Sequence, residues 1–293
     1  MKILTIFLIF GHISGYYLNP FLHFNQRYSN HKTRKYNQLS DNDNYQPKII
    51  NSNQLTLALG HQHHKVNNTL KNKQFITCEP GGLNGFYSMG VAYFLRQHYD
   101  LSQFHFAGAS AGSWVCLMLS LQTDLKYIIE HILSINLTEY KGKNYQKFYH
   151  LQDSLQNIFV NNFEESDFNL SKVYIGVSLF KKFGFKGHLI TNFNNLTDVT
   201  NCCQVSSHIP LITGDIFRTY DQHLAVDGGL KNLPLSLIPN PYFNINSEIW
   251  GRRLEEAFNP NKNLSQLFEW GYLDSLDNMD ILDKIFTKKI NSY

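Results

Sequence analysis

Two short segments carry residues that together can perform acyl transfer. Residues 108–112 read G-A-S-A-G with Ser110 at the centre, and residues 227–229 read D-G-G with Asp227 first. Each segment follows a short apolar run. A serine hydroxyl is a weak nucleophile until a neighbouring base takes its proton, and a carboxylate can be that base. The two segments therefore predict Ser110 as a nucleophile and Asp227 as its base, a Ser–Asp dyad.

The spacing around Ser110 is G-x-S-x-G between a strand-like run at residues 104–107 and an apolar helical run. That context is typical of a nucleophile elbow. Gly108 and Gly112 permit the tight turn because they lack a Cβ atom. We expect Ser110 to project above the N-terminus of the following helix, which stabilises negative charge. The alternative is an incidental serine in a Gly/Ala-rich turn.

The position of Asp227 limits the choice of base. The last of the 13 histidines is His223, so the chain order Ser, Asp, His is excluded with Asp227 as the middle member. A triad with His208 or His223 and an earlier acid, such as Asp167 or Asp198, stays open. An aspartate before two glycines is also common in turns.

A glycine-rich turn at residues 80–85 follows the first expected strand and begins the first expected helix. Gly81 and Gly82 can direct backbone N–H groups inward as a nest. Acyl transfer needs such donors for the oxyanion of the tetrahedral intermediate. A phosphate-binding loop is the competing interpretation, but the segment contains neither G-x-G-x-x-G nor G-K-S/T.

Strand and helix patterns alternate from residue 75 onwards. Strands are expected at residues 75–78, 104–107, 173–179, 187–191 and 224–226. Helices are expected at residues 86–99, 124–135, 145–163, 196–207, 264–270 and 276–286, and directly after Ser110. This alternation predicts an α/β fold with a mainly parallel central sheet.

The N-terminal quarter differs from the rest in charge. Residues 1–75 contain nine Lys/Arg and two Asp/Glu, whereas the remainder contains 17 and 21. The body lacks a basic stripe with interleaved aromatic residues, which argues against nucleic-acid binding. No cysteine shows zinc-ligand spacing, and His61, His63 and His64 lie in the polar leader without partner ligands, so we expect no metal or other cofactor.

The N-terminus also predicts targeting. Residues 1–15 have the shape of a signal peptide, with one lysine, an apolar run too short to span a bilayer, and small residues after it. Residues 16–73 are basic, Asn-rich and of low complexity, as expected for a leader or linker. Entry into the secretory pathway is the expectation. Plastid import by a two-part presequence and a membrane-associated cytoplasmic location are the alternatives.

The glycine-rich loop, the G-x-S-x-G serine and the D-G-G aspartate, in this order, resemble the patatin-like phospholipase family. The resemblance covers about residues 75–231. The segment GFYSMGVAYFLRQHYDL at 85–101 is similar to the animal triacylglycerol-lipase branch and its algal and protist relatives, and SSHIPLITG at 206–214 is similar to the segment that precedes the aspartate strand in the family. It implies a three-layer α/β/α catalytic domain at residues 74–293, with a helical extension at 260–290.

The resemblance also implies roles for single residues. Ser110 would be the nucleophile and Asp227 the base, and Gly81, Gly82 and Leu83 would supply oxyanion N–H groups. The remaining motif positions are Gly85, Gly108, Gly112, Gly228 and Gly229. Substrates would be phospholipids, galactolipids or neutral acylglycerols at a membrane or lipid-droplet surface.

Two residues of the loop depart from the usual G-G-G-x-R/K-G pattern of the family. Pro80 stands at the first glycine and has no N–H to donate. Asn84 stands at the basic position and carries no positive charge. A lipid-binding protein that keeps the fold without turnover is therefore a further alternative.

Overall fold

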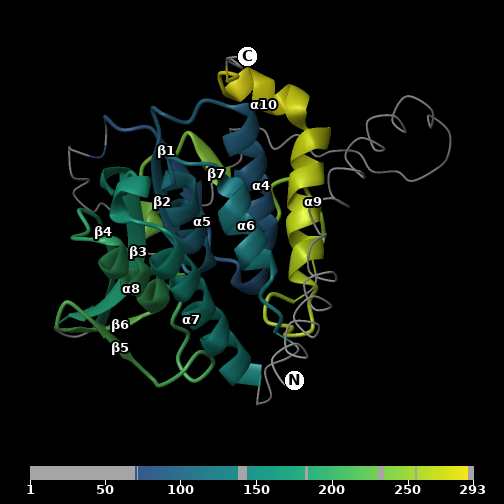
Figure 1. Cartoon of the computed structure of the whole chain (residues 1–293). Helices are drawn as coiled ribbons and strands as arrows, with labels where there is room; N and C mark the ends of the chain where they lie inside the picture. Colours follow the sequence, from purple (N-terminus) through teal and green to yellow (C-terminus); the bar gives the residue numbers. More distant parts are fainter. Residues whose placement is uncertain are drawn as a thin grey trace, which may run out of the picture.

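The structure is a computed structural model that describes residue 70 and residues 72–137, 144–181, 184–229, 234–254 and 256–289 (Figure 1). The expected signal peptide at residues 1–15 lies outside the described residues. So do nearly all of the expected leader at residues 16–73 and the three leader histidines.

One mixed sheet of seven strands forms the centre of the described fold, in the order β5-β6-β3-β2-β1-β7, with β4 also paired to β3. The strands are β1 (Phe75–Cys78), β2 (His105–Ala109), β3 (Val173–Lys181), β4 (Gly184–Ile190), β5 (Arg218–Tyr220), β6 (His223–Val226) and β7 (Phe243–Ile245). Strands β7, β1, β2 and β3 run parallel, whereas β4, β5 and β6 make antiparallel pairs. All four residues of β1 are buried, as expected for a strand covered on both faces. The predicted α/β fold is confirmed.

Helices surround the sheet. They are α4 (Gly85–His98), α5 (Ala111–Ser120), α6 (Leu125–Leu133), α7 (Asn144–Asn162), α8 (Leu196–Ser206), α9 (Leu264–Asp277) and α10 (Met279–Ile285). Figure 1 shows α4 and α9 side by side. Glycine permits this close approach: a Cβ atom at Gly90 would lie 2.1 Å from the Phe268 carbonyl oxygen, and one at Gly271 would lie 2.0 Å from that of Tyr87.

Strands β2 and β6 lie end to end along one edge of β3. Strand β4 pairs with residues 175–181 of β3 and therefore occupies the opposite edge. Ala109, the last residue of β2, pairs with Gly176, and Val226, the last residue of β6, pairs with Ser178. Because β2 is parallel and β6 antiparallel to β3, the two strands run toward each other. The residues that follow them, Ser110 and Asp227, must therefore meet.

None of the described helices is both long enough and apolar enough to cross a bilayer. Cys78, Cys116, Cys202 and Cys203 are free thiols in the buried core.

Candidate active site

Ser110 occupies a strained turn between β2 and α5. Its φ and ψ are 53° and −129°, in a region that a non-glycine residue rarely adopts. A Cβ atom at Gly108 would lie 2.1 Å from the Gly112 carbonyl oxygen, and one at Gly112 would lie 2.0 Å from that of Cys78. The two glycines of G-x-S-x-G are therefore required by close packing on both sides of the serine.

Ser206, the last residue of α8, holds the turn in place. The Ser110 N–H donates to Ser206 Oγ at 2.8 Å, and Ser206 Oγ donates to the Gly176 carbonyl oxygen at 2.6 Å. All three residues lie in the buried interior beside the ends of β2 and β6. The sequence marks this serine only as part of the 206–214 segment, and its contact with the elbow is non-local.

The serine and the aspartate are in direct contact. Ser110 Oγ donates to Asp227 Oδ2 at 2.7 Å, and the Gly229 N–H donates to Asp227 Oδ1 at 2.5 Å. The two side chains are buried, with 5% and 8% of their surface exposed. Burial raises the pKa of Asp227 to about 6, although the hydrogen bonds from Ser110 and Gly229 oppose the rise.

Gly228 allows the aspartate to come this close to β3. A Cβ atom at Gly228 would lie 1.9 Å from the Gly176 carbonyl oxygen. The Gly228 N–H donates to the Ser206 carbonyl oxygen at 2.8 Å. The Asp227 N–H donates to the His208 carbonyl oxygen, also at 2.8 Å. The end of α8 thus anchors both sides of the Ser110–Asp227 pair.

The glycine-rich loop lies beside the pair, and one of its three expected donors is engaged elsewhere. The Leu83 N–H donates to the Ala257 carbonyl oxygen at 2.8 Å, so it is not available for an oxyanion. Within the described residues, no hydrogen bond is made by the N–H of Gly81 or Gly82. Ala111, the first residue of α5, has no partner for its N–H within the helix and lines the same pocket as Ser110. Its N–H is available as a donor in the pocket, although the sequence pattern did not single it out.

The alternative triad would require a histidine side chain to bind Ser110. In the described part of the chain, no histidine side chain hydrogen-bonds to Ser110 or Asp227. The ring of His208 contacts Thr213 Oγ1, and His223 begins β6, at the end of the strand away from Asp227.

The two acids considered for that triad bind other partners. Asp167 accepts the N–H of Glu164 at 2.8 Å in a short 3₁₀ turn. Asp198 accepts the Tyr220 hydroxyl and the N–H of Asn194. The structure therefore joins Ser110 to Asp227 and to none of the alternative partners.

Comparison with known proteins identifies the family. The model of the patatin-like phospholipase family matches residues 77–238, more than half of the chain. The chain belongs to the patatin-like phospholipase family. The match spans the glycine-rich loop, Ser110 and Asp227, and it supports lipid acyl hydrolase activity in general. The comparison with curated proteins found no match.

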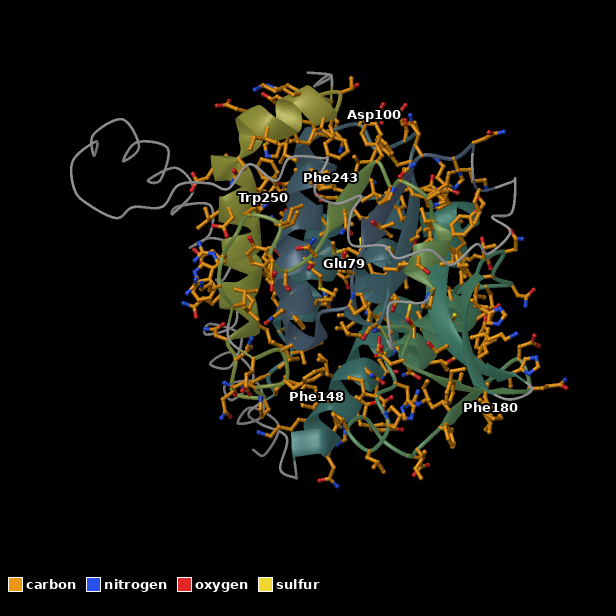
Figure 2. The ribbon with its side chains drawn as sticks, turned by 180° about the vertical axis from the view of Figure 1, so that it is seen from behind. Glu79, Asp100, Phe148, Phe180, Phe243 and Trp250 are labelled. Atoms are coloured by element: carbon orange, nitrogen blue, oxygen red, sulfur yellow. The ribbon has the colours of Figure 1, made fainter. Side chains whose placement is uncertain are left out.

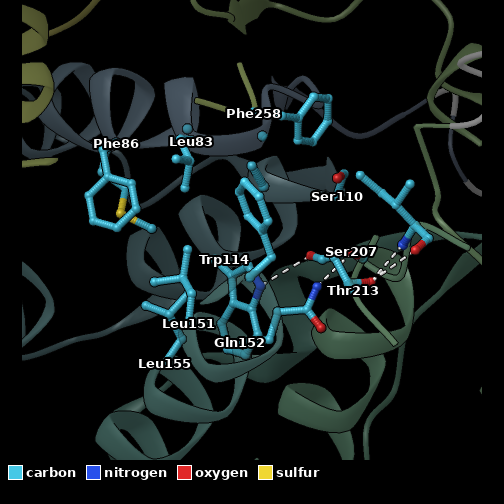
Figure 3. Close-up of a pocket in the computed structure, with 16 residues that line it drawn as sticks. Leu83, Phe86, Ser110, Trp114, Leu151, Gln152, Leu155, Ser207, Thr213 and Phe258 are labelled. Atoms are coloured by element: carbon cyan, nitrogen blue, oxygen red, sulfur yellow. Dashed lines mark hydrogen bonds between the residues drawn. The ribbon is translucent and has the colours of Figure 1, made fainter. Parts of the chain in front are cut away.

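In this patatin-like protein an apolar pocket adjoins Ser110 (Figure 3). Phe86 of α4, Trp114 of α5, and Leu151 and Leu155 of α7 supply much of its lining. Polar groups are confined to one side, where Trp114 Nε1 donates to Ser207 Oγ at 3.2 Å (Figure 3). Such a lining suits a hydrocarbon chain attached to an ester at the serine.

Proposed function

We propose that this protein is a serine-dependent lipid acyl hydrolase that uses a Ser110–Asp227 dyad. The observation that carries the proposal is the 2.7 Å hydrogen bond from Ser110 Oγ to Asp227 Oδ2 within a member of the patatin-like family. Ser110 Oγ attacks the ester carbonyl carbon while its proton moves to Asp227. The alcohol leaves with that proton, and an acyl-serine remains.

Water completes the cycle. Asp227 takes a proton from water as the water attacks the acyl-serine, and the proton then returns to Ser110 Oγ as the fatty acid leaves. The oxyanion of both tetrahedral intermediates is held by the N–H groups of Gly81, Gly82 and Ala111. Loss of one such donor typically lowers kcat by about 10²–10³-fold.

The test of the dyad is covalent labelling of the full chain with a fluorophosphonate. We expect labelling of the wild type, no labelling of Ser110→Ala, and strongly reduced labelling of Asp227→Asn. His208→Ala and His223→Ala should keep substantial labelling, and loss in either would favour a triad. Circular dichroism checks the fold of each variant.

A lack of labelling in a well-folded wild type would refute the hydrolase proposal. If vesicle binding were then retained, the protein would be a lipid-binding member of the fold without turnover.

We further propose that the substrate is reached from a membrane or lipid-droplet surface. The loop at residues 209–217 supports this, because Ile209 lines the pocket while Leu211, Ile216 and Phe217 are 71%, 54% and 42% exposed. Large apolar side chains exposed in one segment mark an interaction site. Phe148 lines the same pocket as Ile209, and Figure 2 shows it at the end of the molecule opposite Asp100. We therefore expect this end to face the lipid surface.

Vesicle sedimentation tests this surface. Leu211→Ser combined with Phe217→Ser should weaken binding to phospholipid vesicles severalfold. Ile281→Ser is the matched control, because Ile281 is 38% exposed on α10 at the other end of the molecule (Figure 1). Equal binding by all three proteins would contradict the proposed surface.

Residues 1–15 are proposed to direct the chain into the secretory pathway, and the triacylglycerol-lipase branch is the proposed affiliation within the family. A fluorescent fusion with and without residues 1–15 tests the first point. Plastid or cytoplasmic membrane localisation of the intact fusion would refute it. Comparison of triacylglycerol and phospholipid turnover tests the second.

A further inference from the structure

A segment far along the chain holds the glycine-rich loop. This C-terminal brace consists of Ala257, Phe258 and Lys262, and it lies beyond the residues 77–238 that match the family model. The Ala257 carbonyl oxygen accepts the Leu83 N–H at 2.8 Å. The brace therefore fixes the backbone of the loop directly after Gly81 and Gly82.

The brace also packs against Gly82 itself. A Cβ atom at Gly82 would lie 2.8 Å from the Ala257 carbonyl oxygen and 3.1 Å from Cε1 of Phe258. Gly82 has a φ of +53°, which glycine adopts without strain. Phe258 in turn lines the pocket beside Ser110, so the brace contacts both the loop and the pocket.

Lys262 brings a positive charge to the loop. Its Nζ donates to Oδ1 of Asn84. Asn84 is buried, with 8% of its surface exposed, and it stands where the usual loop of the family carries arginine or lysine. Its N–H donates to the Gly81 carbonyl oxygen at 3.0 Å, so the residue that Lys262 contacts also closes the turn of the two glycines.

We infer that Lys262 is a positioning residue that replaces the basic residue missing from the glycine-rich loop. The inference rests on the proposed acyl hydrolase function. The lysine ammonium orients the Asn84 side chain and adds positive potential beside the N–H groups of Gly81 and Gly82. Because negative charge develops on the substrate oxygen only as the transition state forms, the contribution acts on kcat rather than on KM.

Lys262→Met tests the charge while keeping an unbranched side chain. We expect about tenfold lower kcat with KM unchanged, less than the 10²–10³-fold that follows loss of a direct oxyanion donor. The rate of fluorophosphonate labelling at Ser110 should fall by about the same factor. Lys262→Arg should retain most of the rate, because it keeps the charge.

Asn84→Lys separates a catalytic contribution from a structural one. In the Lys262→Met background it returns the cation to the loop and should restore most of the lost kcat. In the wild-type background it places two cations together and should lower kcat or stability. A purely structural lysine would not be rescued in this way.

Lys288→Met is the control, because Lys288 pairs with Asp283 at the far end of the chain and is 63% exposed. It should leave labelling and kcat unchanged. A well-folded Lys262→Met with wild-type kcat would overturn the inference, as would an equal rate loss in Lys288→Met or a failed rescue. Failure of the hydrolase proposal would be distinct, since the wild type itself would then not be labelled.

Discussion

Asp227→Asn should make the protein more stable at pH 8 while abolishing activity. The wild-type carboxylate is buried, and burial raises its pKa from 3.8 to about 6. Asparagine is neutral at every pH and has nearly the same shape. Its Oδ1 can keep the hydrogen bond from the Gly229 N–H, and its Nδ2 can donate to Ser110 Oγ.

The size and sign of the effect follow from proton linkage. A rise of about two pKa units corresponds to about 3 kcal/mol at ~1.4 kcal/mol per unit. The folded state binds this proton more tightly than the unfolded chain, so the wild type loses that free energy of unfolding as the pH rises from about 4 through 6. The Asp227→Asn variant does not lose this free energy, because its side chain does not titrate. For a domain of this size the Tm at pH 8 should rise by roughly 6–10 °C.

Thermal unfolding at pH 8 and pH 4.5 measures the difference. It should be large at pH 8 and small at pH 4.5, where Asp227 of the wild type is protonated in the folded state. Asp283→Asn is a control of opposite sign, because Lys288 and Tyr99 hold the pKa of Asp283 below its usual value. That variant should be destabilised at pH 8. An Asp227→Asn protein that is less stable at pH 8, or equally shifted at both pH values, would refute the reasoning.

Three further outcomes follow from the same geometry. The rate constant for acylation of Ser110 should rise with pH with a midpoint of about 6, as Asp227 loses its proton, and ester hydrolysis between pH 5 and 8 measures it. Ser206→Ala should destabilise by ~2 kcal/mol in urea unfolding and slow labelling, because it leaves the Ser110 N–H and the Gly176 carbonyl oxygen unpaired. Gly271→Ala should lower the Tm by several degrees, because its Cβ would lie 2.0 Å from the Tyr87 carbonyl oxygen, whereas Gly184→Ala, with nothing within 4 Å, should not.

The elements around Ser110 could be predicted because their signals are local. Most residues of β1, α4, β2 and α5 are apolar, and the observed ends of these elements lie within two residues of the expected ones where the sequence defined them. Gly108 is required by contacts within the turn and with α5, and Gly112 by its contact with the end of β1, so both requirements arise from neighbouring segments. Sequence alone was therefore enough to place the serine on its elbow.

Other elements depend on partners far away in the sequence. Strands β5 and β7 have three residues each, too few to show a period, and β7 exists because it pairs with β1. The sequence predicts two helices at residues 264–270 and 276–286, whereas α9 runs from Leu264 to Asp277. The expected break falls at Gly271, which is weak in helices in general but here permits the close contact with α4.

The candidate site also combines features with a local sequence signal and features that depend on distant segments. Asp227 could be placed after a strand, but its meeting with Ser110 requires β6 to run antiparallel to β3 on the edge that β2 occupies, a pairing that no local pattern encodes. Engagement of the Leu83 N–H by Ala257 was equally hidden, because the acceptor is a backbone carbonyl 174 residues away, in a segment without periodicity.

Burial links the stability of this site to its proposed chemistry. An aspartate with a pKa of 3.8 is a weak base toward a serine hydroxyl, and one at about 6 is a better base that is still ionised at neutral pH. The interior position that improves the base also makes its charge unfavourable, and the elbow adds backbone strain at Ser110. Both terms oppose folding, so the surrounding packing must offset them. The close contact of α4 with α9, which lies beyond the family match, is one source of that stability. The segments after residue 238 are therefore expected to sustain the reactive pair as well as to complete the fold.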